Sequence, residues 1–499
     1  MPNAFFDNTK TSFAVSRVAL ASAFLAVSLA TFQATSASAQ TPIDFGGSFK
    51  SNAHTVDKQS DPDVAILDDG SFLIVWHSRN QLGIPGFDIF ARHYDADGTP
   101  SADDLEINDF TTGSQVTPAI TATDDGYLVV WQDDRGLDGD FLSGRFFDAE
   151  GAGVGSSFEI LSSDYGAIKP DVDRAPDGSF VVVWQHVAAP FEYEIRGRRL
   201  SSTGASLGDP FVVSDDGDPA VDDNRPTVAV NQRGDFLVTW HGPTPGNPEI
   251  RGRFYTSDGS PTGDSVQLNQ NTAFSQSDSV VTDTPDGFVV AWTNGFADGS
   301  FGAVAARRFD REGQPVGGQF QVNTYTTHNQ FQPTIAADAH GRVVVAWESF
   351  GQDGDQHGLY GQQYDPDGTA VGDEFQINVT MIDNQETPRL AMAPSGDFVV
   401  AWDRGPNDQT SDVYGRRFGL DLDNDGVADR FDNCPVDANA DQFDFDMDGT
   451  GAVCDCNDDQ PEAQTIDLCG VCGGDNSTCG IFFDDFESGD DGAWAAVIP

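Results

Sequence analysis

The sequence predicts an all-β fold, and three observations support this. An apolar run that ends in tryptophan, such as residues 180–184, occurs seven times in the 499-residue chain, at steps of 55, 53, 56, 52, 55 and 55 residues. A Gly-containing turn precedes each run, and glycine accepts the positive φ that a tight hairpin needs. A second turn that closes on glycine, such as residues 365–368, follows in six repeats. The runs end at Trp76, Trp131, Trp184, Trp240, Trp292, Trp347 and Trp402.

Each repeat holds four strand-like segments, which in the sixth repeat are residues 334–337, 343–347, 359–364 and 374–378. The second segment is apolar throughout, so it must be covered on both faces. Four antiparallel strands in a unit of roughly fifty residues, repeated seven times, predict a seven-bladed β-propeller. Tandem immunoglobulin-like sandwiches would need about 100 residues in each unit.

The two ends of the repeat array complement each other. The seventh repeat has a third strand at residues 413–418 and then continues into acidic sequence, so its fourth strand is missing. Residues 45–52 resemble the fourth strands of other repeats, such as residues 317–323. We therefore expect the N-terminal strand to close the ring, which removes the free sheet edges of an open array.

The third strand carries an arginine in six repeats and Gln362 in the other. We expect these arginines to pair with a turn aspartate or a backbone carbonyl in each blade, rather than to bind an anion. The turns between strands one and two and between strands three and four are short. The remaining connections are long and variable, and they share the other end of the blades, where recognition usually resides.

The N-terminus has the features of an export signal. Lys10 and Arg17 precede an apolar run at residues 18–30, and small residues at 37–39 offer a cleavage site. No other segment approaches the length of a membrane span. We expect a signal peptide at residues 1–39, the propeller at 40–419, a calcium-binding repeat at 420–456, a Cys-rich segment at 457–481 and a C-terminal tail at 482–499.

The net charge of −54 repels nucleic acid and anionic lipid and attracts metal cations or basic partners. Residues 421–499 hold 21 acidic residues and one basic residue. Residues 421–432 fit a calcium loop, because oxygen ligands fall at alternate positions and Gly426 permits the sharp turn. The expected ligands are Asp421, Asp423, Asp425, the carbonyl of Val427, Asp429 and Asp432, and in a second loop Asp444, Asp446, Asp448 and Asp455.

Residues 421–455 resemble a thrombospondin type 3 repeat, a calcium-binding module without a packed core. The matching residues are the two aspartate ladders, the motif at 432–435, Asn439, Gln442, and Cys454 with Asp455. The resemblance implies bound Ca²⁺ and a disulfide between Cys434 and Cys454. Ala440 replaces the family's usual proline, and Ala452 replaces an aspartate, which weakens the second calcium site.

All six cysteines lie between residues 434 and 479, in a chain that we expect to be exported. An even number of cysteines in one short exported segment predicts three disulfides. Beyond the pair that the resemblance implies, the connectivity stays open. The cysteines are Cys434, Cys454, Cys456, Cys469, Cys472 and Cys479.

No local catalytic motif stands out. Ser206, between Gly204 and Gly208, matches G-x-S-x-G, but that motif requires a strand-to-helix elbow and here falls on a hairpin. We therefore expect a protein without catalytic activity: an extracellular or cell-surface adhesion protein, with the propeller as a binding platform on a calcium-rigidified stalk. Its expected partner is an extracellular protein or polysaccharide, and the chain is expected to be a monomer. The alternative is a secreted propeller enzyme or lectin that acts on polysaccharide.

Overall fold

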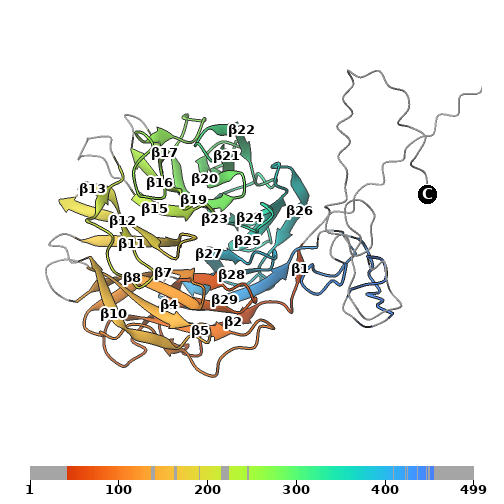
Figure 1. The fold of residues 1–499 in the computed structure, drawn as a ribbon, viewed down its shortest axis with the longest axis horizontal. Coiled ribbons are helices and arrows are strands. Elements are labelled where there is room, and N and C mark those ends of the chain that lie inside the picture. Colours follow the sequence, from red (N-terminus) through yellow and green to blue (C-terminus); the bar gives the residue numbers. More distant parts are fainter. Residues whose placement is uncertain are drawn as a thin grey trace, which may run out of the picture. The chain divides into compact units, whose positions relative to one another are not determined.

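The computed structural model describes residues 42–454, apart from 136–140, 162–165, 190–191, 215–223, 244–246, 408, 422, 424, 435–436, 446 and 448–449. The described residues form seven antiparallel sheets and no helix. The sheets follow one another around a ring (Figure 1), which confirms the predicted seven-bladed β-propeller. None of the described segments therefore has the helical length and hydropathy that crossing a membrane requires.

Six blades have four strands in chain order. Blade 1 contains β3 (Gln59–Ile66), β4 (Phe72–Arg79), β5 (Phe87–Tyr94) and β6 (Leu105–Glu106). Blade 2 contains β7 (Ser114–Ala122), β8 (Gly126–Asp134), β9 (Phe141–Asp148) and β10 (Gly153–Leu161). Blade 3 contains β11 (Ala167–Arg174), β12 (Phe180–Ala189), β13 (Glu192–Leu200) and β14 (Phe211–Val212).

The next three blades repeat this order. Blade 4 contains β15 (Asn224–Val230), β16 (Phe236–Pro243), β17 (Pro248–Tyr255) and β18 (Val266–Gln267). Blade 5 contains β19 (Gln276–Thr284), β20 (Gly287–Gly295), β21 (Gly302–Asp310) and β22 (Pro315–Gln321). Blade 6 contains β23 (Gln330–Ala337), β24 (Val343–Phe350), β25 (His357–Tyr364) and β26 (Ala370–Gln376).

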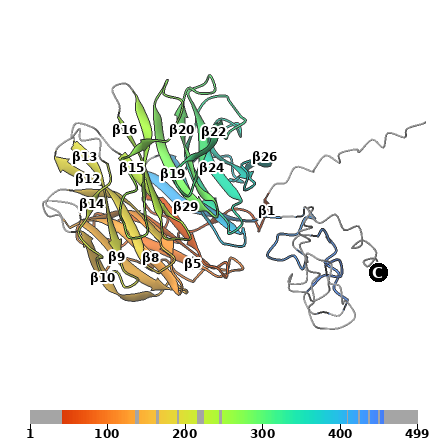
Figure 2. The same cartoon turned by 45° about the horizontal axis from the view of Figure 1, so that its top comes forward.

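Blade 7 joins the two ends of the propeller. It contains β27 (Asn384–Met392), β28 (Phe398–Asn407) and β29 (Thr410–Gly419), and β29 also pairs with β1 (Ile43–Asp44) and β2 (Phe49–Lys50). The first strand of each blade is the innermost. It packs beside the first strands of both neighbouring blades, with β27 beside β3 (Figures 1 and 2).

The hydrophobic core consists of seven clusters, and each cluster joins two adjacent blades. The cluster between blades 7 and 1, for example, contains Val64 and Trp76 from blade 1 together with Val399 and Val413 from blade 7. All seven repeat tryptophans are fully buried. The second strand is buried on both faces, as its apolar sequence predicts. Adjacent blades therefore pack against each other through their second strands.

The N-terminal segment closes the ring, with one difference from the prediction. It pairs with β29 as two short strands, Ile43 opposite Gly419 and Phe49 opposite Gly415, rather than as one strand over residues 45–52. Gly46 and Gly47 lie between them with φ of 105° and 80°, so the chain bulges away from the ladder there.

The segment after β2 also performs the role of a fourth strand. Asn52 Oδ1 accepts a hydrogen bond from the Val413 amide at 2.7 Å. In blade 6, Asn378 Oδ1 accepts the same bond from the Leu359 amide, also at 2.7 Å. The N-terminal segment therefore reproduces the polar cap that ends the fourth strand elsewhere.

In six blades the third-strand arginine donates to a backbone carbonyl of the preceding blade, which fits the expected structural role, whereas Gln362 in blade 6 donates to the Val371 carbonyl of its own blade. Arg145 donates to the Ile107 carbonyl at 2.9 Å, and Arg307 donates to the Leu268 carbonyl at 2.8 Å. Across the closure, Arg92 donates to the Ser51 carbonyl at 2.9 Å. The other pairs are Arg198 with Ile160, Arg253 with Val213, and Arg416 with Ile377.

The inner strands contain a bulge that the sequence analysis missed. In blade 6 the inner strand begins at Gln330, four residues before the predicted start, and its pairing shifts between Phe331 and Thr334. The residue inside the bulge has φ between 48° and 52° in every blade, although none is glycine. A bulge redirects side chains and interrupts the ladder. The seven bulge residues are Asp61, Thr117, Lys169, Arg225, Asp278, Gln332 and Thr387.

We expect Phe49→Ala to destabilise the propeller, because the Phe49 ring packs 4.9 Å from Tyr94 and 6.3 Å from Phe72 across the closure. Loss of a packed phenylalanine costs about 3 kcal/mol. Urea unfolding followed by tryptophan fluorescence measures this change. Val154→Ala, at an exposed position of β10, is the control. An unchanged midpoint in Phe49→Ala would show that the closure contributes little.

Candidate active site and candidate metal centre

The first candidate site lies where the inner strands begin, at the end of the propeller that carries the long connections. At each junction the repeat matches the bulge residue with the residue that follows the buried tryptophan on the second strand of the preceding blade. We call this ring of paired positions the channel mouth. Five of the seven junctions show a hydrogen bond from the bulge amide. The bonds run from Asp61 to Asp403 (3.3 Å), Thr117 to His77 (3.5 Å), Asp278 to His241 (3.3 Å), Gln332 to Thr293 (3.1 Å) and Thr387 to Glu348 (2.7 Å).

One side of the mouth, from blade 3 to blade 5, carries a basic group formed by Lys169, Arg225 and His241. Lys169 Nζ donates to Asn224 Oδ1 at 2.6 Å, and Arg225 forms an ion pair with Asp278. The Asp278 amide donates to His241 Nδ1 at 3.3 Å. Because Nδ1 is the acceptor, the neutral His241 ring carries its proton on Nε2.

Burial shifts the pKa values of the basic group towards the neutral forms. Burial, aided by the charge of Arg225, lowers the pKa of Lys169 to about 8. Burial also lowers the pKa of His241 to about 4, although Asp278 opposes the shift. Near neutral pH, His241 is therefore uncharged, and part of Lys169 is available as a free amine.

The opposite side of the mouth, on blades 6, 7 and 1, carries an acidic group. Asp403 Oδ2 accepts the Asp61 amide, and Asp61 lies 3.6 Å from His77 Nδ1. Glu348 accepts the Thr387 amide through one oxygen and lies 3.2 Å from His357 Nδ1 through the other.

Burial raises the pKa values of these two carboxyl groups. The pKa of Asp403 lies well above its ordinary value, because the side chain is buried and Asp61 adds a second negative charge. Burial also raises the pKa of Glu348. Burial disfavours charged His357, yet its hydrogen bond to Glu348 outweighs burial and raises the pKa of His357. The mouth therefore combines a lysine with a lowered pKa on one side with carboxyl groups of raised pKa on the other.

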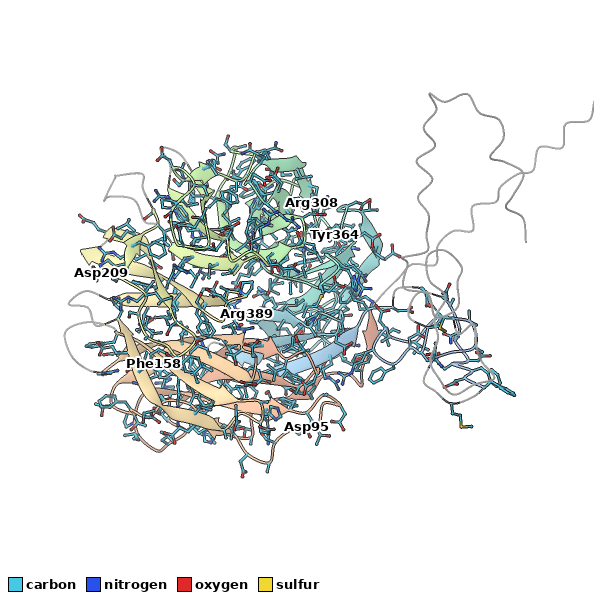
Figure 3. All side chains as sticks on the ribbon, viewed as in Figure 1. Asp95, Phe158, Asp209, Arg308, Tyr364 and Arg389 are labelled. Carbon is cyan, nitrogen blue, oxygen red and sulfur yellow. A yellow bond between two sulfur atoms is a disulfide. The ribbon has the colours of Figure 1, made fainter. Side chains whose placement is uncertain are left out.

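Further along the chain, the inner strands of blades 1, 3 and 5 carry four aspartates with raised pKa values. Asp63 accepts a hydrogen bond from the Ile120 amide at 2.9 Å, and Asp173 accepts one from the Val230 amide at 2.7 Å. Both side chains thus bind the backbone of a neighbouring inner strand. Burial raises the pKa of Asp63 to about 6, of Asp171 to about 7, of Asp173 to about 8 and of Asp283 to about 6. The charge of Arg389, which is labelled among the inner strands in Figure 3, opposes this rise in the pKa of Asp63.

The second candidate site is the predicted first calcium loop. Carboxylate oxygens of Asp421, Asp423 and Asp425 lie within 4.8 Å of one another. The backbone follows the carboxylates around a turn, because Asp421 accepts the Gly426 amide at 3.0 Å and Gly426 has φ of 95°. Burial and the neighbouring carboxylates raise the pKa of Asp423 to about 6.

Asp432, the last predicted ligand of this loop, is buried. Its Oδ1 accepts from the Cys434 amide and from Gln442 Nε2, both at 2.8 Å. The Oδ2 atoms of Asp423 and Asp432 are buried and have no hydrogen-bond partner among the described residues. Uncompensated buried carboxylate oxygens are costly, and a hard cation such as Ca²⁺ binds such oxygens. The residues present therefore fit a calcium ion.

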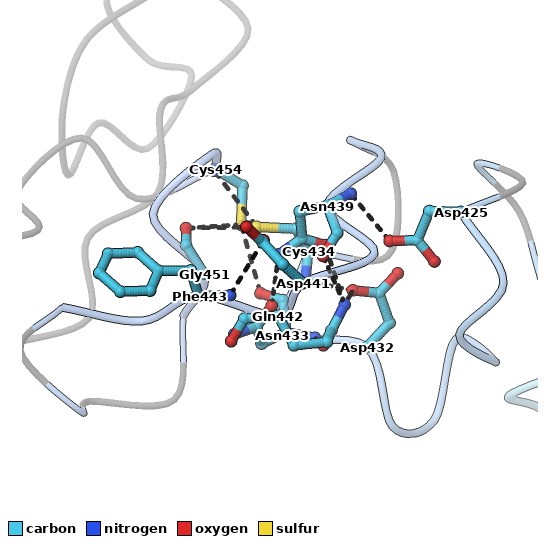
Figure 4. Close-up of a disulfide and its surroundings, with 10 residues drawn as sticks. All are labelled: Asp425, Asp432, Asn433, Cys434, Asn439, Asp441, Gln442, Phe443, Gly451 and Cys454. Carbon is cyan, nitrogen blue, oxygen red and sulfur yellow. Dashed lines mark hydrogen bonds between the residues drawn. A yellow bond between two sulfur atoms is a disulfide. The ribbon is translucent and has the colours of Figure 1, made fainter.

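The predicted disulfide between Cys434 and Cys454 is present, with Cα atoms 5.6 Å apart (Figure 4). Around it, the Asn433 amide donates to Gln442 Oε1 at 2.8 Å, and the Ala452 amide donates to the Phe443 carbonyl at 2.7 Å. Here a covalent bond and a polar network hold a segment that has no hydrophobic core.

The calcium loop contacts the propeller at the end opposite the channel mouth. Asp429 forms an ion pair with Arg342 of blade 6 at 2.9 Å. Arg430 pairs with Asp397 of blade 7 at 3.1 Å and donates to the Asp69 carbonyl of blade 1 at 3.2 Å. The Phe431 ring lies 5.3 Å from Phe45 of the N-terminal segment. Residues 429–431 thus contact the three blades and the segment that close the ring.

The remaining predicted site residues are only partly described. Asp429 faces Arg342, and Val427 donates its amide to Asp425 at 2.8 Å. In the second predicted loop, Asp444 accepts the Met447 amide at 2.7 Å. Outside the described residues lie Asp446, Asp448, Asp455, Cys456, Cys469, Cys472 and Cys479, and also the predicted signal peptide.

Searches against family models and curated proteins find no match. Solved structures do match. A polysaccharide lyase, an ulvan lyase bound to -[GlcA(1-4)Rha3S]-, has a TM-score of 0.50 and 10% identity over 73% of this chain and 95% of its own. A protein of unknown function from Dyadobacter fermentans has a TM-score of 0.47 and 10% identity over 76% of this chain and 99% of its own. At these identities the likeness is one of fold.

The prediction that this chain is not an enzyme is contradicted by the comparison with solved structures, because the matching propeller with a TM-score of 0.50 is a polysaccharide lyase. The prediction relied on the absence of a local catalytic motif. A site at the mouth of a propeller takes one residue from each of several blades, so its members are about fifty residues apart and form no local motif.

A sequence signal for the mouth did exist. Proline follows the bulge residue in six of the seven blades, at Pro62, Pro118, Pro170, Pro226, Pro333 and Pro388. The residue before each proline, and the residue after each tryptophan, vary in charge from blade to blade. Variation at a fixed position of a regular repeat distinguishes these positions from the invariant structural ones.

The raised pKa values of the four inner-strand aspartates predict that the propeller loses stability as pH rises. The pKa of Asp173 is near 3.8 in the unfolded chain and about 8 in the folded state. Between these two pH values the folded state holds more protons on Asp173 than the unfolded chain. The free energy of unfolding therefore falls as pH rises through this window. We expect the melting temperature of the unmodified protein to fall from pH 5 to pH 8. The melting temperature of Asp173→Asn should fall less over the same range. Asp258→Asn, at an exposed turn, is the control. Equal slopes for all three proteins would contradict the assignment.

Proposed function

We propose that this chain is an exported propeller enzyme that cleaves polysaccharide at the channel mouth. The observation that carries the proposal is the basic group. Lys169 has a pKa of about 8, and it lies on a rigid ring of inner strands beside Arg225 and neutral His241. A general base is most effective when its pKa lies near the working pH. Groups whose pKa values are shifted by their surroundings are common at catalytic sites.

The residues of the basic group have different roles in this proposal. The free amine of Lys169 takes the proton beside the carboxylate of an acidic sugar, the C–O bond to the leaving sugar breaks as a C=C bond forms, and the lysine ammonium returns a proton to the leaving oxygen. His241 Nε2–H donates a hydrogen bond to a sugar oxygen. Arg225, whose side chain is 48% exposed, attracts an acidic sugar substituent. In a chain with a net charge of −54, this is a local positive region suited to an acidic polysaccharide. The fold likeness to an ulvan lyase fits the proposal.

Export follows from the same proposal, because a polysaccharide substrate is met outside the cell. The predicted signal peptide and the disulfide between Cys434 and Cys454 support this location.

We expect Lys169→Arg to abolish cleavage while it preserves substrate binding. Arginine keeps the positive charge but does not deprotonate, so it cannot act as a base. General-base catalysis contributes about 10²–10⁴-fold, which sets the expected loss in kcat. In the unmodified protein, activity should rise as pH approaches 8, since the neutral form of Lys169 is the active one. Released reducing ends, measured on ulvan, polygalacturonate and alginate, provide the assay.

The matched control is Lys50→Arg, the same substitution in the N-terminal segment outside the mouth, where arginine can keep the ion pair with Asp412, and it should retain activity. Full activity in Lys169→Arg would remove Lys169 as the base. Absence of cleavage of any acidic or neutral polysaccharide by the unmodified protein would contradict the proposed function itself.

A second function is supported by a separate observation. We propose that Asp421, Asp423, Asp425 and Asp432 bind Ca²⁺, because three of these carboxylates converge and two buried carboxylate oxygens have no hydrogen-bond partner among the described residues. The thrombospondin type 3 resemblance supports the same ion. Bound Ca²⁺ would fix the first half of the loop, whose second half contacts the ring closure.

We therefore expect Ca²⁺ to raise the melting temperature of the propeller, measured by tryptophan fluorescence, because all seven repeat tryptophans lie in its core. Calorimetric titration should give a dissociation constant of about 10⁻⁴–10⁻³ M, as in extracellular modules. Asp423→Asn should weaken binding, whereas Asp437→Asn, at an exposed position outside the loop, should not. Binding without a change in melting temperature would show that the loop and the closure are uncoupled.

A further inference from the structure

A strip of exposed aromatic side chains lies at the same end of the propeller as the channel mouth. In blade 5, Phe274, Phe296 and Phe301 are 43%, 49% and 63% exposed. The Phe296 ring lies 5.3 Å from the Phe274 ring and 5.7 Å from the Phe301 ring. Single exposed phenylalanines are ordinary, but a row of three, in which the Phe296 ring contacts both others, forms a surface that water solvates poorly.

The strip continues onto blade 6. Phe350, 38% exposed, lies 5.6 Å from His328 and 5.2 Å from His357. The Ser300 hydroxyl donates to the His328 carbonyl at 2.7 Å and so joins the loops of the two blades. We call Phe274, Phe296, Phe301, His328 and Phe350 the aromatic strip.

The backbone holds the blade 5 part of the strip in place. Phe296 has φ of 52°, a conformation that is rare and costly for a bulky side chain. The Phe296 amide donates to the Phe301 carbonyl at 3.2 Å, and the Gly295 amide donates to the Ser275 carbonyl at 2.9 Å. These bonds bring the three rings, which come from two different connections, onto one surface.

One end of the strip contacts the channel mouth, because His357 lies against both Phe350 and Glu348. The other end is near the mouth in the chain, since Phe274 precedes Asp278, the partner of Arg225 in the basic group, by four residues. The strip therefore lies beside the mouth, at the end of the propeller where cleavage is proposed.

We propose that the aromatic strip binds sugar rings of the polysaccharide beside the point of cleavage. The inference rests on the proposed function. A pyranose presents a face of C–H groups, which packs against the face of an aromatic ring, while its hydroxyl groups remain in water. Such a subsite grips an internal stretch of polymer, so the enzyme favours long chains over short ones.

The test compares Phe301→Ala and Phe296→Ala with the unmodified protein on polymer and on a short oligosaccharide of the best substrate from the panel. An aromatic contact is worth about 0.5–1.5 kcal/mol, so KM for the polymer should rise about 3–10-fold in each variant. The kcat for the polymer, and both constants for the oligosaccharide, should stay within twofold. Phe301→Trp should retain the low KM. Phe445→Ala, a phenylalanine in the tail that is 64% exposed, is the matched control.

The outcomes separate the two proposals. If the unmodified protein neither binds nor cleaves any polysaccharide of the panel, the proposed function fails and the strip loses its ligand. If it cleaves polymer and the phenylalanine variants keep the same KM, only the strip is overturned. A self-association that Phe301→Ala abolishes, measured by analytical ultracentrifugation, would overturn it too, because the strip would then be an interface between copies.

Discussion

The pairing of β1 and β2 with β29 is the interaction on which the rest of the propeller depends. Without it, β29 would expose an unpaired edge, and Phe72 and Tyr94 of blade 1 would lose the ring of Phe49 that packs beside them. The closure joins residues more than 360 positions apart, and three kinds of contact hold it. These are the ladder pairs, the Asn52 cap on the Val413 amide, and the bond from Arg92 to the Ser51 carbonyl.

Closure has a consequence for the two ends of the molecule. Every blade is held by the same apolar second strand and by inter-blade polar bonds, so the loops at the mouth need not contribute to folding. The bulge residue can then be Lys169 in one blade, Asp278 in another and Gln332 in a third, on a constant backbone. A rigid scaffold with variable side chains at one end is a common way to build binding and catalytic sites.

The charge distribution places different chemistry at opposite ends. The basic group lies at the mouth, where Lys169 and Arg225 offset the general excess of acid. The acidic loop at residues 421–432 lies at the other end, and its residues 429–431 contact blades 6, 7 and 1. This geometry connects the acidic loop with the ring closure, in contrast to a stalk that only spaces the propeller from a surface.

The sequence by itself determined the architecture. The regular step between tryptophans, the turn glycines and the missing last strand predict seven closed blades, because apolar strands must be covered and sheet edges paired. It also predicted the Cys434–Cys454 disulfide, which the structure contains, and the acidic loop at residues 421–432, since both are local motifs. The structure decided where the inner strands bulge, so that the inner strand of blade 6 begins at Gln330 rather than at residue 334. It also divided the closing segment into two short strands on either side of Gly46 and Gly47. It also brought Lys169, Arg225 and His241 together, which local sequence cannot do, because neighbours in a ring of inner strands are a whole blade apart in the chain.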